Sequence, residues 1–436
     1  METIAPFDIE ALKRDWIEGI AGDVFSEEVS RCASKIKAGG ERVQLGGVLI
    51  CEQDPVAFAA AFFAAVSLSV PVVLANPRWG RFEWATFQSL VNPALTFGKS
   101  FFEPQEGQHD PLPRGSILIP TGGTTGGVKL AIHSWSSLHV AARSVADFLG
   151  GGPVNSCCCL PLFHVSGLMQ LIRSFVSDGC IRFDDTKMEG YCLSLVPTQL
   201  QRLLQDEMSC RKLATARAIF VGGAAMPTAV SEQARALRLP IIPVYGMTET
   251  AAMVAAVPSD DFIGSPSAGA VPVGGARFQI APDGRLRIHS PALFVGYQGQ
   301  AAIDPVEGYL TDDEARIDED GKLHVLGRAD RLIISGGEKI DPREVEDAIR
   351  EVAGLQEVIA IGYPDAEWGE KLVVFYVDRP GSRRISEWQD SLWEQLANYK
   401  FPKQLISVPK LPVDERGKLD WSMIHTAVED NLNESR

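Results

Sequence analysis

A glycine- and threonine-rich segment at residues 121–129, with the sequence TGGTTGGVK, has the composition of an anion-binding loop. Glycines let the backbone approach an anion closely, threonine hydroxyls and main-chain amides can donate to phosphate oxygens, and Lys129 adds a cation. It is not a Walker loop, because Lys129 lies two residues after Gly127 and no Ser or Thr follows it. The next residues, VKLAIHS, alternate with the period of a strand, so we expect the loop to connect two strands. A glycine-rich hairpin without a ligand is the alternative interpretation of this segment alone.

A second group of polar residues lies in the segment YGMTET, at residues 245–250. Thr248 and Glu249 follow a predicted buried strand and offer a hydroxyl and a hard oxygen ligand, as Mg²⁺ prefers. Considered alone, Glu249 is typical of a solvated helix start. The small residues of GGA, at 222–224, also follow a predicted strand, where a tight turn without a ligand would need the same glycines.

These segments occur in the order found in the adenylate-forming superfamily of acyl-CoA synthetases, luciferases and peptide-synthetase adenylation domains, which the chain resembles from about Pro55 onward. The first segment resembles the phosphate loop of that superfamily, although Val128 and Leu130 stand where proline and glycine are usual. The resemblance implies that ATP phosphates are held by Thr121, Gly122, Gly123, Thr124, Thr125, Gly126 and Lys129.

The segment YGMTET resembles the YGxTE segment of the superfamily. The resemblance implies that Thr248 and Glu249 approach the α-phosphate, with Glu249 as the Mg²⁺ ligand. It also implies an adenine side formed by an aromatic ring and small residues, namely Tyr245, Gly246, Gly222, Gly223 and Ala224.

Three segments near the C-terminal end complete the resemblance. GYLTDDEARID resembles GWxxTGD, which assigns the ribose hydroxyls to Asp313, and GRADRLIISGGEKIDPREVE resembles the domain boundary, with Arg328 on the ribose and Asp330 as the hinge. Residues 335–339 resemble the loop that lines the thiol tunnel. LPVDERGKLDW resembles the PxxxxGK stretch, which makes Lys418 the catalytic lysine; alone, it would be interpreted as a solvated side chain.

The segments PLFHVSGL (residues 161–168) and SLVPTQLQRLL (residues 194–204) are expected to line an acyl pocket, with His164 at its entrance. A packed histidine at a strand end is the alternative for His164. The residues that the resemblance assigns to the acid or thiol substrate are His164, Ser166, Thr198, Gly246 and Gly337. Within the superfamily these segments resemble the o-succinylbenzoate–CoA ligases of menaquinone and phylloquinone synthesis. Other aryl– or fatty acid–CoA ligases and a carrier-protein-loading adenylation domain remain open.

The resemblance implies a ligase that uses ATP, Mg²⁺ and CoA. A substrate carboxylate attacks the α-phosphorus and pyrophosphate leaves, after which the small domain turns about Asp330 and a thiolate displaces AMP. Thr248, Glu249, Lys418 and His164 are the expected catalytic residues. A catalytically inactive nucleotide-binding module is disfavoured, because the charged residues of every segment are present.

Elements that position these residues can be predicted from the hydrophobic pattern. Short β-rich runs alternate with helical runs through the first three-quarters of the chain, which indicates α/β layers with a largely parallel, buried sheet. Asp283-Gly284 and Asp320-Gly321 mark hairpin turns. We therefore expect a large N-terminal domain of layered sheets and helices at residues 1–329. A smaller mobile α+β domain at residues 330–436 would carry Lys418.

The composition limits the classes of ligand and partner that we expect the protein to bind. A net charge of −15 argues against nucleic acid and anionic membranes, so we expect a small carboxylic acid, ATP and CoA as ligands. Eight cysteines without a CxxC pair, and no signal-peptide pattern, predict a cytoplasmic protein. The apolar stretch at residues 55–75 is long enough for a membrane span, but Asp54-Pro55 and Pro71 favour a buried helix followed by a buried strand. Monomer and homo-oligomer both stay open.

Overall fold

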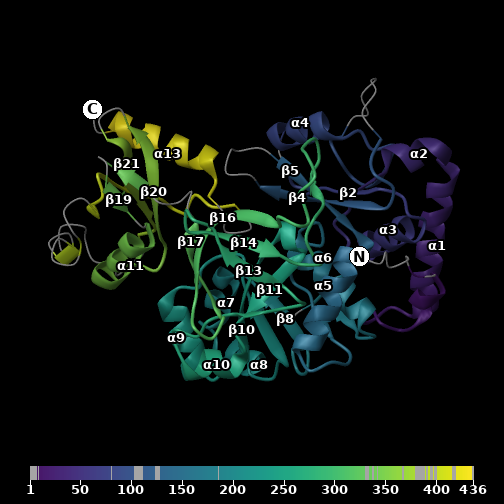
Figure 1. The fold of residues 1–436 in the computed structure, drawn as a ribbon, viewed down its shortest axis with the longest axis horizontal. Helices are drawn as coiled ribbons and strands as arrows, with labels where there is room; N and C mark the ends of the chain where they lie inside the picture. The colour runs from purple at the N-terminus through teal and green to yellow at the C-terminus, as the bar shows by residue number, and fades with distance from the viewer. Residues whose placement is uncertain are drawn as a thin grey trace. The chain divides into compact units, whose positions relative to one another are not determined.

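The structure of the chain is a computed structural model. It describes residues 7, 9–79, 81–102, 111–122, 128–184, 186–328, 333–335, 338–340, 342–365, 368–378, 388, 391–392, 396, 400–414 and 419–434. The chain divides into two compact units (Figure 1). The first contains Met1–Gln279, Arg287–Leu310 and Ile317–His324, and the second contains Ile280–Leu286, Thr311–Arg316 and Val325–Arg436. The predicted boundary at residues 329 and 330 lies outside the described residues and stays a prediction.

The apolar stretch at residues 55–75 forms a helix and a strand, as predicted. Helix α3 begins at Pro55, where the Asp54 carboxylate accepts from the amides of Val56 and Ala57 at 3.1 and 2.8 Å. Strand β2 (Val72–Leu74) follows and is fully buried. No described helix is long and apolar enough to cross a membrane.

Two sheets form the frame of the first unit. In the six-stranded sheet the neighbouring strands β3, β1, β2 and β4 are parallel, and β5 and β15 add antiparallel strands at one edge. In the seven-stranded sheet β7, β6, β8, β9 and β10 are parallel, and β11 and β12 are antiparallel. The predicted, largely parallel buried sheet is therefore confirmed, in two copies.

The strands of the first sheet, in order, are β15 (Gly296–Tyr297), β5 (Val128–Ser134), β4 (Ser116–Gly122), β2, β1 (Val48–Cys51) and β3 (Leu95–Gly98). Those of the second are β12 (Val271–Pro272), β11 (Ala252–Ala256), β10 (Ile241–Met247), β9 (Ala218–Val221), β8 (Cys192–Leu195), β6 (Ser156–Cys157) and β7 (Ile181–Arg182).

Helices α5 (Trp135–Phe148) and α6 (Val165–Val176) lie side by side and connect the two sheets (Figure 1). Helix α5 contacts β5 of the first sheet and β11 of the second, so both sheets share a core with these helices. The other described helices of the first unit are η1 (Ile9–Lys13), α1 (Gly22–Ala38), α2 (Gly40–Gly46), α3 (Pro55–Ser67), α4 (Arg81–Leu90), α7 (Pro197–Leu203), α8 (Glu207–Leu213), α9 (Thr228–Ala236), η2 (Thr248–Thr250) and α10 (Ser259–Gly264).

A four-stranded sheet follows in the chain, and its turns at Gly284 and Gly321 have φ of +86° and +77°, as the predicted hairpins require. Its order is β13 (Arg277–Ile280), β14 (Arg285–His289), β16 (Tyr309–Ile317) and β17 (Leu323–Arg328).

The five-stranded sheet of the second unit packs with one face against buried apolar residues of α11 (Pro342–Ala353). Its other face packs against buried apolar residues of α13 (Trp421–Glu434). Its strands run in the order β19 (Glu338–Ile340), β18 (Ile333–Ser335), β21 (Gly369–Tyr376) and β20 (Val358–Asp365), with β22 (Gln404–Ser407) on β21.

Candidate active site

The predicted phosphate loop connects two strands, as expected from the sequence. Strands β4 and β5 pair in antiparallel register, with Thr121 opposite Lys129 and Gly122 opposite Val128. Thr121 is buried and Lys129 is half-buried, so the hairpin holds both residues at one end. Other predicted phosphate ligands, Gly123, Thr124, Thr125 and Gly126, lie outside the described residues.

The segment YGMTET crosses from β10 into the short helix η2. A β-carbon on Gly246 would lie 1.8 Å from the carbonyl oxygen of Ala252, so only glycine fits there. Ala251 and Ala252 have φ of +51° and +73°, a conformation that costs about 1–3 kcal/mol for a residue with a side chain. The turn is therefore strained, and it places the Glu249 side chain in a site where it is only 7% exposed.

Tyr297 on β15 connects the two predicted phosphate-binding segments. Its hydroxyl donates to Oε1 of Glu249 and lies 3.2 Å from the hydroxyl of Tyr309. Its ring lies 5.2 Å from Nζ of Lys129. Burial, followed by the charge of Glu249, raises the pKa of Tyr297, so the phenol stays protonated and acts as a donor. Sequence reasoning missed this residue, for which an aromatic hydroxyl in the glycine-flanked VGYQG was the only signal.

His133 on β5 ties the phosphate hairpin to the same turn. Its Nε2 lies 2.7 Å from the main-chain oxygen of Thr248, and its Nδ1 lies 3.1 Å from Oγ of Ser137. Burial lowers the pKa of His133 to about 4, so the imidazole is neutral near pH 7 and donates from Nε2 to the carbonyl. His133 was also missed, because a histidine in a strand pattern has no signal of its own.

The predicted adenine-side residues lie near the ends of the adjacent parallel strands β9 and β10. Gly222 follows β9, and a β-carbon there would lie 2.6 Å from the Val244 side chain; Gly223 has a φ of +84°. Ala224 is exposed, and Tyr245 lies half-buried on β10. The backbone therefore requires glycine at both positions. A tight turn without a ligand and an adenine site would both have this requirement.

The predicted acyl-side residues begin two helices. His164 is the residue before α6, and its ring packs edge-on against Phe163 at 4.5 Å, while Ser166 is half-buried in the first turn. Thr198 is the second residue of α7, and its side chain lies outside the described part.

Arg173, near the end of α6, is the third residue that sequence reasoning missed. It is 5% exposed, and its Nε and Nη1 have no hydrogen-bond partner among the described residues. The guanidinium lies 5.0 Å from the ring of Phe220 on β9, and burial lowers the pKa of Arg173 to about 10. A buried cation without a carboxylate is costly. The signal was a lone cation in the apolar helix VSGLMQLIRSFV.

The remaining predicted residues belong to the C-terminal part of the chain. Asp313 is buried in the middle of β16, and Arg328 is the last residue of β17, with a side chain outside the described part. Both are assigned to the second compact unit. Asp330, Gly337 and Lys418 lie outside the described residues, so their predicted roles stay predictions.

Two family models match this chain in the order of its sequence. Residues 103–298 match the AMP-binding enzyme family, and residues 344–418 match the AMP-binding enzyme C-terminal domain. The chain is 30% identical over 429 residues to the 2-succinylbenzoate–CoA ligase of Listeria monocytogenes, over 90% of this chain and 91% of that protein. The chain belongs to the AMP-binding enzyme family. The predicted resemblance to adenylate-forming enzymes is confirmed.

Two solved proteins share the fold of this AMP-binding enzyme. The o-succinylbenzoate CoA synthetase (MenE) of Bacillus subtilis, in complex with the acyl-adenylate intermediate OSB-AMP, matches with a TM-score of 0.78 at 24% identity over 94% of each chain. ATP-bound MatB of Rhodopseudomonas palustris matches with a TM-score of 0.78 at 23% identity, also over 94% of each chain. Since both match equally well, the fold confirms the predicted architecture but does not select the acid.

The donor set at Glu249 suits Mg²⁺ in an AMP-binding enzyme. The carboxylate is buried and hard, and Tyr297 donates to one of its oxygens, Oε1. Mg²⁺ is commonly bound by one or two carboxylates together with substrate phosphates and water. Glu249 therefore fits an ion shared with the phosphates of ATP.

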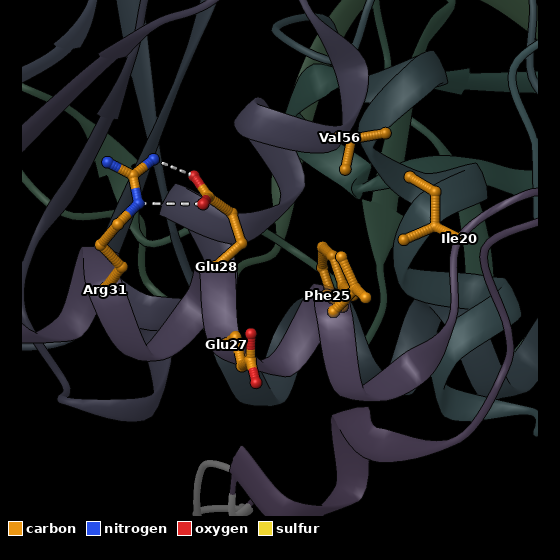
Figure 2. Close-up of a pocket in the computed structure, with 7 residues that line it drawn as sticks. Ile20, Phe25, Glu27, Glu28, Arg31 and Val56 are labelled. Carbon is orange, nitrogen blue, oxygen red and sulfur yellow. Dashed lines mark hydrogen bonds and ion pairs between the residues drawn. The ribbon is translucent and has the colours of Figure 1, made fainter.

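A surface hollow of about 350 Å³ lies on the N-terminal helices of this AMP-binding enzyme, between α1 and the start of α3 (Figure 2). Glu27, Glu28 and Arg31 supply its charged lining, and Arg31 is already paired with Glu28, with Nε 2.9 Å from Oε2. No predicted site residue lines this hollow. Two carboxylates and a paired cation would repel a triphosphate, so the hollow is no candidate for the nucleotide site.

Proposed function

We propose that this chain is an ATP-dependent 2-succinylbenzoate–CoA ligase that acts through an acyl-adenylate. In the first half-reaction an oxygen of the substrate carboxylate attacks the α-phosphorus of ATP, and pyrophosphate leaves. In the second, the CoA thiolate attacks the acyl carbon, and AMP leaves with the former carboxylate oxygen. The near full-length similarity to a 2-succinylbenzoate–CoA ligase carries this assignment.

The first unit supplies the groups that hold the nucleotide. Lys129 and Thr121, at the end of the β4–β5 hairpin, would donate to the β- and γ-phosphates, and Thr248 would donate to the α-phosphate. When bound, Mg²⁺ would offset negative charge on the phosphate oxygens. Glu249 is held in place for this ion by Tyr297 and by the main-chain bond from Phe294 N, at 2.9 Å.

The second unit would complete each half-reaction in turn. We assign the ribose hydroxyls to Asp313 and Arg328, and the bridge between carboxylate and α-phosphate to Lys418. The part of the chain from Asp330 onward would then turn as a mobile domain and present residues 335–339, including Gly337, to the thiol.

A diacid substrate would explain the buried charge of Arg173. One carboxylate of 2-succinylbenzoate is adenylated, and the other needs a partner that is not the catalytic lysine. Arg173 lies on the helix that starts at His164, and its guanidinium is buried without a hydrogen bond from Nε or Nη1 in the described part of the chain. The second carboxylate would pair with this cation, while Ser166, Thr198 and Gly246 would line the rest of the acyl pocket.

The test is a pyrophosphate-release screen across carboxylic acids, with and without CoA. We expect 2-succinylbenzoate to give the highest rate and to need CoA for repeated turnover. A higher rate with a fatty acid or with an aryl monoacid would overturn the substrate assignment. Turnover that requires a carrier protein in place of CoA would overturn the thiol assignment.

A variant of the buried arginine tests the diacid argument directly. Arg173→Met should lower kcat/KM for 2-succinylbenzoate roughly 30-fold or more, since a buried charge pair loses one partner. Benzoylpropionate, the same acid without its ring carboxylate, should lose little. Arg211→Met, an exposed arginine on α8, is the control and should change neither substrate. Equal losses for both acids with Arg173→Met would remove the diacid argument.

We further propose that the reaction serves menaquinone or phylloquinone synthesis in the cytoplasm, where ATP and CoA are available together. The eight cysteines are not disulfide-bonded, which is usual for proteins of that compartment.

A further inference from the structure

The side chain of Tyr297 contacts two oppositely charged groups, Glu249 and Lys129. The proposed function places both groups at the same nucleotide. The carboxylate of Glu249 accepts a hydrogen bond from the hydroxyl of Tyr297. The ammonium of Lys129 lies 5.2 Å from the ring centroid of the same residue. Among the described residues no ion pair joins Lys129 to Glu249.

A direct ion pair between these two groups would be harmful to catalysis. Lys129 would then have to leave Glu249 before it could bind a phosphate, and Glu249 would lose oxygen positions that a cation needs. A ring face attracts an ammonium less strongly than a phosphate does, so Lys129 can be transferred to the nucleotide. A neutral phenol donates to Glu249 without cancelling its charge.

The fold holds Tyr297 rigidly enough for this task. Its backbone pairs with Ala131 on β5, the same strand that carries Lys129. Its ring packs edge-on against buried Phe294 at 4.9 Å, and its hydroxyl lies 3.2 Å from that of Tyr309. Phe294 in turn donates its main-chain amide to the carbonyl of Glu249 at 2.9 Å.

We propose that Tyr297 is a positioning residue that keeps Lys129 and Glu249 apart, so that both charges stay available to the phosphates and to Mg²⁺. This inference rests on the proposed nucleotide site. Tyr297 would then have two separable roles. Its hydroxyl positions the metal ligand Glu249, and its ring positions the phosphate-binding Lys129.

Two substitutions separate these roles. Tyr297→Phe keeps the ring beneath Lys129 and removes the hydroxyl from Glu249, whereas Tyr297→Leu removes both. Binding of a non-hydrolysable ATP analogue is measured by calorimetry, once with Mg²⁺ and once with a chelator. For Tyr297→Phe we expect the Mg²⁺-dependent gain in affinity to shrink about threefold to tenfold, with unchanged metal-free binding. For Tyr297→Leu we expect metal-free binding to weaken by a similar factor, roughly threefold to tenfold.

A double variant decides whether the two charges pair when Tyr297 is lost. In Tyr297→Leu/Glu249→Gln the lysine has no carboxylate to pair with, so metal-free binding should recover to within about twofold of the wild type. Tyr363→Phe, which removes the hydroxyl beside His425 in the second unit and keeps the ring that contacts Lys371, is the matched control and should bind like the wild type in both buffers. Urea unfolding of each variant without ligand checks that the fold is retained.

The outcomes are distinct. If the wild-type chain does not bind the ATP analogue at all, the proposed function fails. If the wild type binds and Tyr297→Leu binds equally well without metal, or if Glu249→Gln does not restore binding to the leucine variant, the charge-separation role is overturned.

Discussion

The imidazole Nε2 of His133 lies 2.7 Å from the main-chain oxygen of Thr248, which anchors the strand after the phosphate loop to the turn that carries Glu249. The contact joins residues that are 115 positions apart in sequence, and its His133 side is buried. It fixes the tautomer of His133, because only a protonated Nε2 can donate to a carbonyl.

This contact predicts a pH-dependent stability. The pKa of His133 is about 4 in the folded chain against an ordinary 6.5, so over that interval the unfolded chain binds a proton that the folded chain does not. The contribution of His133 is fully present above pH 6.5 and is lost as the pH falls toward 4, by about 3 kcal/mol at most. Urea unfolding at about pH 7.5 and about pH 5 should show a smaller difference for His133→Gln than for the wild type. His425→Gln, at an exposed position, should keep the wild-type difference.

Glu249→Gln should lower acid-dependent pyrophosphate release at least about tenfold, since an amide oxygen is a weaker ligand for Mg²⁺ than a carboxylate. The defect should be largest at limiting Mg²⁺ and smaller at saturating Mg²⁺. Initial rates over a Mg²⁺ series measure both. Unchanged rates at limiting Mg²⁺ would show that Glu249 is not the metal ligand.

Gly246→Ala should abolish adenylation or folding, because its β-carbon would lie 1.8 Å from the carbonyl oxygen of Ala252 and neither backbone can move freely. Gly264→Ala is the matched control, since a β-carbon there meets nothing within 4 Å. Soluble yield, urea unfolding and pyrophosphate release compare the two variants. A fully active Gly246→Ala enzyme would mean that the pairing of β10 with β11 at Gly246 is looser than the structure shows.

Lys418→Ala should separate the two half-reactions. Its cation is needed while a carboxylate approaches a phosphate, so adenylation should slow by a factor on the order of 10²–10³, with a much smaller change in KM. Given chemically made acyl-adenylate and CoA, the variant should form thioester at close to the wild-type rate. Failure in that second assay would make Lys418 a structural residue, and normal adenylation would exclude it as the catalytic lysine.

Asp330→Pro should affect the two half-reactions unequally. Proline fixes φ at the predicted hinge and should trap one orientation of the C-terminal part of the chain. Single-turnover adenylation and thioester formation from acyl-adenylate are measured separately. Equal slowing of both would place the hinge elsewhere.

Several features of this protein were determined by the sequence alone, because they depend on neighbouring residues. The period-two pattern of VKLAIHS predicted that residues 121–129 connect two strands, and Asp54 with Pro55 predicted the start of α3. The glycines of the hairpin turns were predicted in the same way. The order of the AMP-binding segments indicated the family before any contact was known.

Tertiary structure alone decided which distant residues share the site. Tyr297 reaches Glu249 across 48 residues because the two-residue strand β15 adds to the edge of β5, and no local pattern encodes that pairing. The same holds for Arg173, whose missing partners become visible only when α6 is packed against the second sheet. Periodicity reports which face of an element is buried, whereas the identity of the buried neighbour depends on how sheets and helices assemble.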